Sequence, residues 1–396
     1  MKRKHNFAIL LASQILSKLS DRMILVGLSW YILQVSSKQM LAEFLVVSML
    51  PHFFMIFFSG KIINRFSPIS IMKAMELSRS LVFLFLFVLF FLKSQSVIVI
   101  TMLIMLSNLC ASLFNPALLT VPKQLKFKPD QFKRICALLN TTAAIAMMIG
   151  PILVAPIYMT GGVELLISLA FFLYLMAWIF ELFIENIPWE IFRESSDHVK
   201  RFSRYSIFLN DNRLIIRLLC LFFIINLAFI PLQLLIPILV KDHYHLTIHF
   251  LAMLEFYFGL GLVLGGLLIS TFPFSMKPWL YMSIPYFIAS IAYLFLGLTT
   301  ISFGAIVAIF CFGFFLSVGN VQALSFYQIY PQEKNAATIM SLVNFISNAS
   351  GPAALFIAGL LISVLNVQDL IILYALISMG IIFFLPFSRE LRQVRI

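Results

Sequence analysis

The chain has 396 residues, of which 62% are hydrophobic and 11% are charged. A soluble domain carries roughly 25% charged residues, so this composition excludes an ordinary soluble enzyme or binding domain. The formal net charge is +12 at pH 7. In a membrane protein such an excess is expected in cytoplasmic loops and requires no nucleic-acid partner. We therefore predict an all-α polytopic membrane protein.

Apolar runs long enough to cross a bilayer recur twelve times. A spanning helix needs about 20 mostly apolar residues, and charged or Pro/Gly/Asn clusters mark where each run ends. The polar interval 187–212 divides them into two sets of six, so we predict an N-terminal half (1–186), a cytoplasmic loop (187–212) and a C-terminal half (213–396). The predicted segments are 6–34, 41–60, 69–92, 96–120, 134–159, 163–186, 213–240, 247–271, 277–297, 301–328, 336–363 and 367–387.

Lysine and arginine are distributed unequally between the two sets of connecting segments. Of the 28 such residues, 22 fall on the termini and the even-numbered turns, and three fall on the opposite turns. The other three, Lys18, Arg22 and Arg79, lie inside predicted helices. The positive-inside rule therefore predicts that both termini and the loop 187–212 face the cytoplasm.

The two halves resemble each other weakly in sequence. Each has an asparagine in its fourth helix, followed by an asparagine and a Gly-Pro pair in its fifth. A six-plus-six repeat is typical of secondary transporters, in which one half rocks against the other. The corresponding residues are Asn115, Asn140, Gly150 and Pro151 in the first half, and Asn320, Asn344, Gly351 and Pro352 in the second.

Four stretches carry a resemblance to a known family. They read SQILSKLSDRMILVGLSWYILQ in the first helix, MELSR in the third, SLFNPALLTVPK with the following ALLN and IGPILV, and LEFYFGLGLVLGGLLIS in the eighth. On these residues the chain resembles the major facilitator superfamily. More narrowly, it is similar to the bacterial branch of siderophore exporters (the enterobactin-exporter type) and macrolide-efflux proteins. The resemblance implies two pseudo-symmetric six-helix halves and secondary transport.

The loop between the second and third helices departs from that family's pattern, which reads Gly-x-Leu-x-Asp-Arg-x-Gly-Arg-Arg. Here it reads GKIINRFSPIS, in which Gly60 and Arg65 fit, while Asn64, Ser67 and Pro68 replace the Asp, the Gly and an Arg. The resemblance implies a gating role for Gly60 and Arg65.

Three charged residues interrupt the first predicted helix. Asp21 lies about 22 Å along the helix from Asn6, past the middle of a hydrocarbon core about 30 Å thick. A charge at this depth costs about 2.5–3.5 kcal/mol on insertion scales. Lys18 and Asp21 are three residues apart and can pair, and Arg22 is four residues from Lys18. The cluster either holds helices together or, with its excess positive charge, binds an anionic substrate.

Two carboxylates are candidate proton carriers. The family resemblance points to Asp21, and Glu255 lies about 13 Å deep in its helix with no basic residue at i±3 or i±4. Buried carboxylates exchange protons in many transporters. The alternative for Glu255 is a protonated side chain that hydrogen-bonds a neighbouring helix.

Other polar residues in predicted helices have either a structural or a functional interpretation. Glu76 and Arg79 form an i, i+3 pair in the third helix, where a structural or gating role is expected. The amides either bind substrate or bond to another helix. The Gly-Pro pairs are expected to bend or loosen their helices. The amides predicted to bind substrate, together with Lys18 and Arg22, are Asn115, Asn140, Asn226, Asn320, Gln322 and Asn344.

Nothing in the sequence indicates an enzyme or a cofactor. The chain lacks GxGxxG and Walker A motifs, and its cysteines and histidines do not have metal-ligand spacing, apart from a weak surface possibility at His243, His245 and His249. We expect no metal and no cofactor.

We predict a monomeric, proton-coupled exporter of a small organic compound, a siderophore or drug-like molecule, in a bacterial inner membrane. Two alternatives stay open. One is a transporter of lysophospholipid or another lipid, or an importer of an anionic solute. The other is a transport-inactive membrane scaffold or sensor. Protons, lipid and a small-molecule substrate are the expected partners.

Overall fold

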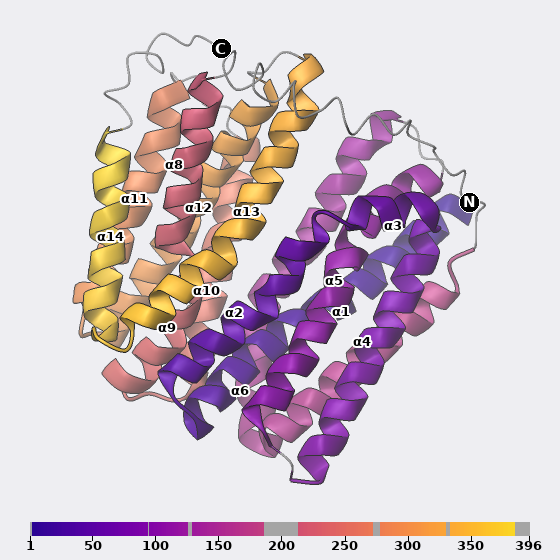
Figure 1. Cartoon of the computed structure of the whole chain (residues 1–396), viewed down its shortest axis with the longest axis horizontal. Helices are drawn as coiled ribbons and strands as arrows, with labels where there is room; N and C mark the ends of the chain where they lie inside the picture. Colours follow the sequence, from indigo (N-terminus) through magenta and orange to yellow (C-terminus); the bar gives the residue numbers. More distant parts are fainter. Residues whose placement is uncertain are drawn as a thin grey trace. The chain divides into compact units, whose positions relative to one another are not determined.

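In a computed structural model, the described residues are 2–93, 95–125, 129–185, 213–271, 278–329 and 333–384 (Figure 1). They are overwhelmingly helical, and no strand occurs among them. The prediction of an all-α chain is confirmed. The predicted loop 187–212 lies outside the described residues.

Contacts within the chain define two units. Unit 1 comprises Met1–Phe192 and His245–Phe256, and unit 2 comprises Arg193–Tyr244 and Tyr257–Ile396. The predicted boundaries of the two halves and of the loop between them stay a prediction. Each unit is described separately below.

Unit 1 is built on four long helices that pack against one another. α1 packs mainly on α6, while α4 packs on both α5 and α6, and Figure 1 shows α4 and α5 side by side. Leu10, Met72 and Phe114, from α1, α4 and α5, are fully or almost fully buried in this packing. The helices are α1 (Lys2–Val35), α2 (Lys38–Met55), α3 (Ser59–Arg65), α4 (Pro68–Phe91), α5 (Val97–Gln124) and α6 (Pro129–Leu182).

Unit 2 contains the second set of helices. α11 packs on α12 and α14, and α8 packs on α13 and α14. The first residues of α10 are grouped with unit 1 and the remainder with unit 2. The elements are α8 (Arg213–Phe229), α9 (Leu232–Ile238), the π-helical turn η1 (Leu239–His243), α10 (Ile248–Thr271), α11 (Pro278–Leu298), α12 (Ser302–Ile329), α13 (Glu333–Leu361) and α14 (Val367–Phe384).

Helix boundaries differ from the predicted segments at three places. The run 41–60 ends as a helix at Met55, and the short α3 then begins at Ser59. The run 213–240 breaks before Pro231, which lacks the backbone donor that would continue the helix. Conversely, α6 is continuous in hydrogen bonding across two predicted spans, but Gly161 and Gly162 are non-helical and separate them, with Gly162 at φ 66°.

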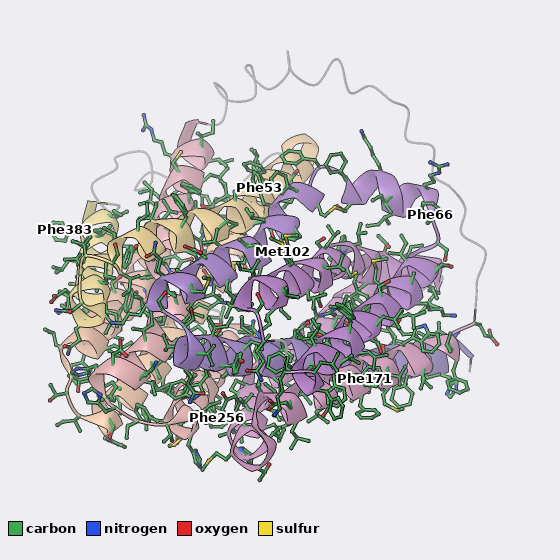
Figure 2. All side chains as sticks on the ribbon, turned by 60° about the horizontal axis from the view of Figure 1, so that its bottom comes forward. Phe53, Phe66, Met102, Phe171, Phe256 and Phe383 are labelled. Atoms are coloured by element: carbon green, nitrogen blue, oxygen red, sulfur yellow. The ribbon has the colours of Figure 1, made fainter. Side chains whose placement is uncertain are left out.

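The described helices present the surface expected of a membrane protein. Seven of them are long and apolar enough to cross a bilayer, by length and composition. Figure 2 shows side chains projecting from both sets of helices, and Phe66, Met102 and Phe383 are each more than half exposed. Such widespread apolar exposure is compatible with lipid and not with water.

Association of helices in a bilayer depends on close packing. Lipid tails are as apolar as leucine, so moving an apolar side chain from lipid into a helix interface contributes little free energy. In unit 2, Gly261 and Gly265 of α10 lie against the backbone of α12. A methyl group on Gly261 would meet the carbonyl oxygen of Phe310 and lie 2.8 Å from the backbone nitrogen of Phe314. These glycines therefore allow the two helices to approach closely.

Gly261→Ala should lower the stability of the protein by about 1–3 kcal/mol, the usual range for overpacking. The measurement is the thermal unfolding midpoint in detergent. Gly380→Ala in α14 is the control, because a methyl group there meets nothing within 4 Å. Equal unfolding midpoints for the two variants would contradict the close approach of α10 and α12.

Candidate functional site

A polar stripe on α1 positions the charged cluster of unit 1. Ser13, Ser17 and Asp21 follow one another at four-residue intervals, so they share one face of the helix. Ser13 and Ser17 are fully buried, whereas the Asp21 side chain is 27% exposed. The stripe meets side chains of α4 and α6, and it therefore runs from the interior of unit 1 to an accessible end at Asp21.

Arg79 of α4 is the centre of this cluster and is 1% exposed. Nη2 donates to Asp21 Oδ1, and Nη1 donates to Ser17 Oγ at 3.1 Å and lies 3.7 Å from Glu76 Oε1. Nε donates to Ser107 Oγ of α5 at 3.4 Å. Every guanidinium nitrogen therefore has a polar partner, which is the condition under which a buried arginine is tolerated.

Tyr174 of α6 completes the environment of Asp21. Its hydroxyl donates to Asp21 Oδ1 at 2.7 Å and accepts from Arg79 Nη2 at 2.7 Å. Its ring stacks on Phe83 with centroids 5.1 Å apart, and Arg79 Cζ lies 4.2 Å from its centroid. The ring therefore restricts the guanidinium to one orientation, with its nitrogens directed at the carboxylate.

Lys18 lies on the accessible side of Asp21. Its Nζ is 3.6 Å from Asp21 Oδ2, and it donates to Asn115 Oδ1 of α5 at 2.7 Å. The predicted pairing of Lys18 with Asp21 is confirmed. The Lys18 side chain is 21% exposed. Lys18 is thus the cation of this cluster that a molecule arriving at the exposed edge meets first.

The arrangement gives Asp21 two different cations, Lys18 on its exposed side and Arg79 on its buried side. Both stabilise the ionised carboxylate, while loss of hydration opposes ionisation. A proton on Asp21 would remove both ion pairs at once. Asp21 thus links α1 to α4 directly through Arg79, and Lys18 links the same stretch of α1 to α5 through Asn115.

Arg22 faces a different neighbour from Lys18. Its Cβ lies 2.8 Å from where a methyl group on Gly150 would be, so Gly150 gives α1 room against α6. The segment that carries Glu255 is grouped with unit 1, and within that unit the charges of Arg22 and Glu255 attract each other. The sequence shows no basic residue at i±3 or i±4 of Glu255, which stays true. The neighbouring cation, Arg22, comes from α1, far away in the chain.

In unit 2, two of the predicted amides, Asn320 and Gln322, lie two residues apart on one helix, α12, and so point to different faces of it. Asn320 Oδ1 accepts from Tyr286 Oη of α11 at 2.8 Å. Gln322 is 9% exposed, and its Oε1 has no hydrogen-bond partner among the described residues. Tyr286 also borders a small pocket between α8, α11 and α12.

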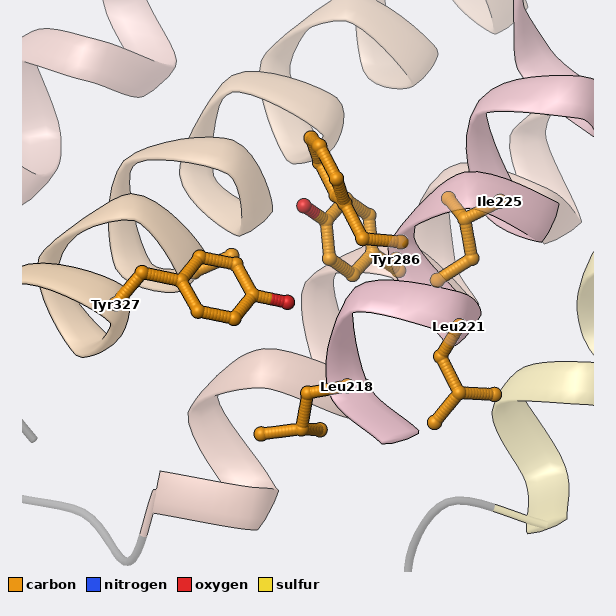
Figure 3. Close-up of a pocket in the computed structure, with 7 residues that line it drawn as sticks. Leu218, Leu221, Ile225, Tyr286 and Tyr327 are labelled. Carbon is orange, nitrogen blue, oxygen red and sulfur yellow. The ribbon is translucent and has the colours of Figure 1, made fainter. Parts of the chain in front are cut away.

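That pocket is almost entirely apolar. Figure 3 shows the rings of Tyr286 and Tyr327 facing Leu218, Leu221 and Ile225 of α8. The two phenol groups are the polar part of its lining. An apolar lining of this kind disfavours a charged group.

The remaining predicted positions have separate environments. Asn226 Nδ2 donates to Phe222 O within its own helix at 2.9 Å. Asn344 is exposed, and its carbonyl oxygen accepts from Asn348 Nδ2 at 2.8 Å. The side chain of Asn140 lies outside the described residues. These amides are not brought to the charged cluster by described contacts.

The predicted gating positions lie at helix ends and inside two long helices. Gly60 is exposed, and a methyl group there would meet nothing within 4 Å. Arg65 Cζ lies 5.8 Å from the ring centroid of Phe66. Pro151 lies inside α6 and Pro352 inside α13, and in each helix the preceding glycine, Gly150 or Gly351, is buried. Their roles stay predictions.

Three titratable groups near the cluster were not among the predicted site residues. Tyr174 and Glu181 lie seven residues apart on one face of α6, and His52 of α2 interacts electrostatically with Asp21. The seven-residue spacing of Tyr174 and Glu181 places both on one face of α6. Compared with the polar stripe on α1, this spacing could have indicated from the sequence that the two faces meet. Among the described residues, no group of three His, Cys, Asp or Glu side chains is close enough to hold a metal ion.

Comparisons with known proteins agree with this fold. The chain resembles the solved structure of the nucleoside transporter NupG (D323A mutant), with a TM-score of 0.79 and 11% identity over 96% of this chain and 99% of that one. It also resembles a POT family transporter in complex with a thioalcohol-conjugated peptide, with a TM-score of 0.79 and 12% identity over 98% of this chain and 97% of that one.

A further similar structure is the POT family transporter PepTSo, with a TM-score of 0.76 and 11% identity over 99% of each chain. At these identities the likeness shows the fold and not the substrate. No curated protein matches the sequence. The family model for the Major Facilitator Superfamily matches residues 10–355. Its match over most of the chain, together with the all-helical fold, shows that this protein is a multi-pass membrane protein of the major facilitator superfamily.

Proposed function

We propose that this transporter exports a small organic compound, a siderophore or drug-like molecule, in exchange for protons across a bacterial inner membrane. One observation carries the proposal: Asp21 is a partly exposed carboxylate held between an accessible lysine and a buried arginine. Proton binding at Asp21 releases both cations, and loss of the proton restores both ion pairs. Such an exchange links proton movement to a change in helix packing.

The substrate side of the proposal rests on Lys18. Lys18 would bind an anionic group of the substrate, while the ionised Asp21 carboxylate beside it would accept a hydrogen bond from a hydroxyl or ammonium group of the same molecule. Asn115, which already accepts from Lys18, lies beside it. Glu255 is proposed as a second proton carrier, with Arg22 as its cation. A proton on Asp21 would block the hydrogen bond from the substrate, so protons and substrate would compete for the Asp21 carboxylate, which is the requirement for antiport.

We propose a monomeric carrier with both termini in the cytoplasm. The distribution of lysine and arginine supports this orientation, because 22 of the 28 lie on one side of the predicted topology. Cysteine substitutions at Lys61 and Lys93, on turns assigned to opposite sides, would report the orientation through a membrane-impermeant thiol reagent. Labelling of the Lys93 position alone in intact cells is the expected result.

The direction of coupling can be measured in proteoliposomes with three probes: an iron-free catecholate siderophore, a macrolide and a lysophospholipid. Antiport predicts accumulation of a probe when the vesicle interior is acidic. Accumulation with an acidic exterior would instead show symport, and therefore import. Accumulation of the lysophospholipid alone would favour a lipid transporter, and no movement of any probe under either gradient would contradict the proposal.

Lys18→Met should weaken binding of an anionic probe such as the catecholate siderophore. A hydrogen bond to a charged group is worth about 1.5–3 kcal/mol, so the dissociation constant should rise roughly tenfold or more. Titration by intrinsic tryptophan fluorescence measures it. Lys61→Met, at an exposed position of α3, is the matched control and should bind like the wild type. Equal affinities for the two variants would exclude Lys18 from the site.

A further inference from the structure

A second carboxyl pair lies deeper in unit 1 than Asp21. Glu76 of α4 is completely buried and Glu181 of α6 is 1% exposed. Ser17 donates to Glu76 Oε1 at 2.6 Å, and Ser13 Oγ lies 3.4 Å from Glu181 Oε1. Because Ser13 and Ser17 are one turn apart on α1, the two carboxyl groups lie beside consecutive turns of the same face.

The ion pairs around the two carboxyl groups are distributed unequally. Arg79 is shared by Asp21 and Glu76, and Lys18 pairs with Asp21. Among the described residues no ion pair involves Glu181, and its Oε2 has no hydrogen-bond partner. The like charges of Glu76 and Glu181 repel each other. The titratable groups that act on the pair from the packed helices are Lys18, Asp21, Lys73, Arg79 and, through Glu76, Cys110.

A buried carboxylate without a cation is expensive, and two carboxylates that share a site do not both ionise readily. Glu76 keeps Arg79 at 3.7 Å and a hydrogen bond from Ser17, both of which favour its ionised form. Glu181 has neither. The neutral acid is therefore the form in which Glu181 fits its surroundings.

The hydrogen bonds of Ser13 lead to the same conclusion. A serine hydroxyl has one hydrogen and two lone pairs. Ser13 Oγ donates that hydrogen to the carbonyl oxygen of Leu10 at 2.9 Å. Its remaining contact, 3.4 Å from Glu181 Oε1, is then best satisfied by a hydrogen on the Glu181 carboxyl group, with Ser13 as the acceptor.

We propose that Glu181 is a proton-binding site inside unit 1, and that the proton it holds leaves toward the Lys73 end of the unit during transport. Glu181 is one residue from the end of α6, and Lys73, which is partly exposed, donates to Ile184 O at 3.1 Å just beyond it. In the transfer, the O–H bond of Glu181 breaks and its proton passes to a water molecule. This leaves a carboxylate and a hydronium ion. The role of Glu181 in transport rests on the proposed function, because it assumes proton coupling. The binding of a proton by Glu181 does not depend on that function.

Infrared spectroscopy of the purified full-length protein tests proton binding without any substrate. A neutral carboxyl group gives a C=O stretching band that shifts in heavy water. We expect such a band at neutral pH in the wild type and its loss in Glu181→Gln. Glu43→Gln, which removes an exposed carboxylate of α2, is the control and should keep the band.

The unfolding midpoint provides an independent check. Gln has the shape of a neutral glutamic acid and can also donate to Ser13, so Glu181→Gln should unfold at the wild-type temperature. A band unchanged in Glu181→Gln would overturn the proposal. Loss of the wild-type band on adding sodium at constant pH would also overturn it, in favour of a metal-cation site.

Transport then separates this proposal from the proposed function. With the probe that the wild type accumulates, Glu181→Gln should lower accumulation driven by the pH gradient at least about tenfold, with probe-for-probe exchange unchanged. Gradient-driven accumulation at the wild-type level would overturn the transport role of Glu181. If the wild type moves no probe, the proposed function fails, while the infrared result still decides whether Glu181 binds a proton.

Discussion

Arg79→Met is expected to destabilise the folded protein by about 3–5 kcal/mol, the cost of breaking a buried ion pair by removing one partner. Arg79 is 1% exposed and is bonded to Asp21, Tyr174, Ser17 and Ser107. Without it, the Glu76 carboxylate keeps only one serine donor in a site closed to water. The thermal unfolding midpoint in detergent and the yield of monodisperse protein measure the loss.

A second substitution distinguishes loss of charge balance from loss of volume. If uncompensated carboxylate charge causes the loss of stability, adding Asp21→Asn to Arg79→Met should restore part of it. The double variant keeps only one of the two carboxylates, Asp21 and Glu76, that lose their arginine partner. Arg65→Met, at an exposed position of α3, should leave the midpoint unchanged. An Arg79→Met variant as stable as Arg65→Met would mean that the buried network does not stabilise unit 1.

Asp21→Asn is expected to separate transport from the pH gradient. The amide has nearly the same shape and still accepts from Arg79 and Tyr174, but it can neither ionise nor lose a proton. Probe accumulation driven by an acidic interior should fall at least about tenfold, a difference of about 1.4 kcal/mol, while probe-for-probe exchange continues. Parallel accumulation and exchange assays in proteoliposomes measure the two activities.

Asp369→Asn is the matched control for this experiment, because it removes an exposed aspartate from the first turn of α14. It should behave like the wild type in both assays. Glu255→Gln tests the other proposed carrier in the same way. If accumulation persists in both Asp21→Asn and Glu255→Gln, the coupling residues have been assigned wrongly.

The helix layout could be predicted from the sequence, because an uninterrupted apolar run has few alternatives in a bilayer. Its ends were less predictable. The apolar composition of this stretch does not indicate that one helix, α2, ends at Met55 and another, α3, begins at Ser59. Proline and glycine gave better signals, since Pro231 and the Gly161–Gly162 pair coincide with breaks in the structure.

Contacts within one helix were predictable, whereas contacts between helices were not. The spacing of Lys18 and Asp21 predicted their pairing, and the structure confirms it at 3.6 Å. The pairing of Asp21 with Arg79 joins α1 to α4 and depends on how the helices rotate about their axes. A pattern within one helix does not determine that rotation. For the same reason, Arg79 was assigned to a local pair with Glu76 alone.

Glu181 was missed for a different reason. A carboxylate near the predicted end of a spanning segment is usually hydrated at the membrane surface. In the structure it is buried, because α6 turns the face that carries Tyr174 and Glu181 toward the stripe of Ser13, Ser17 and Asp21 on α1. Two polar stripes on separate helices, compared with each other, would have indicated a shared buried interface.

The central claim is that Asp21 exchanges a proton with each transport cycle, and proton movement driven by substrate tests it most directly. Vesicles containing a pH-sensitive dye would be given a gradient of the probe that the wild type accumulates. Entry of the probe into wild-type vesicles should make the interior more alkaline, and Asp21→Asn should take up the probe by facilitated diffusion without that change. Proton movement at the wild-type rate in Asp21→Asn would contradict the account.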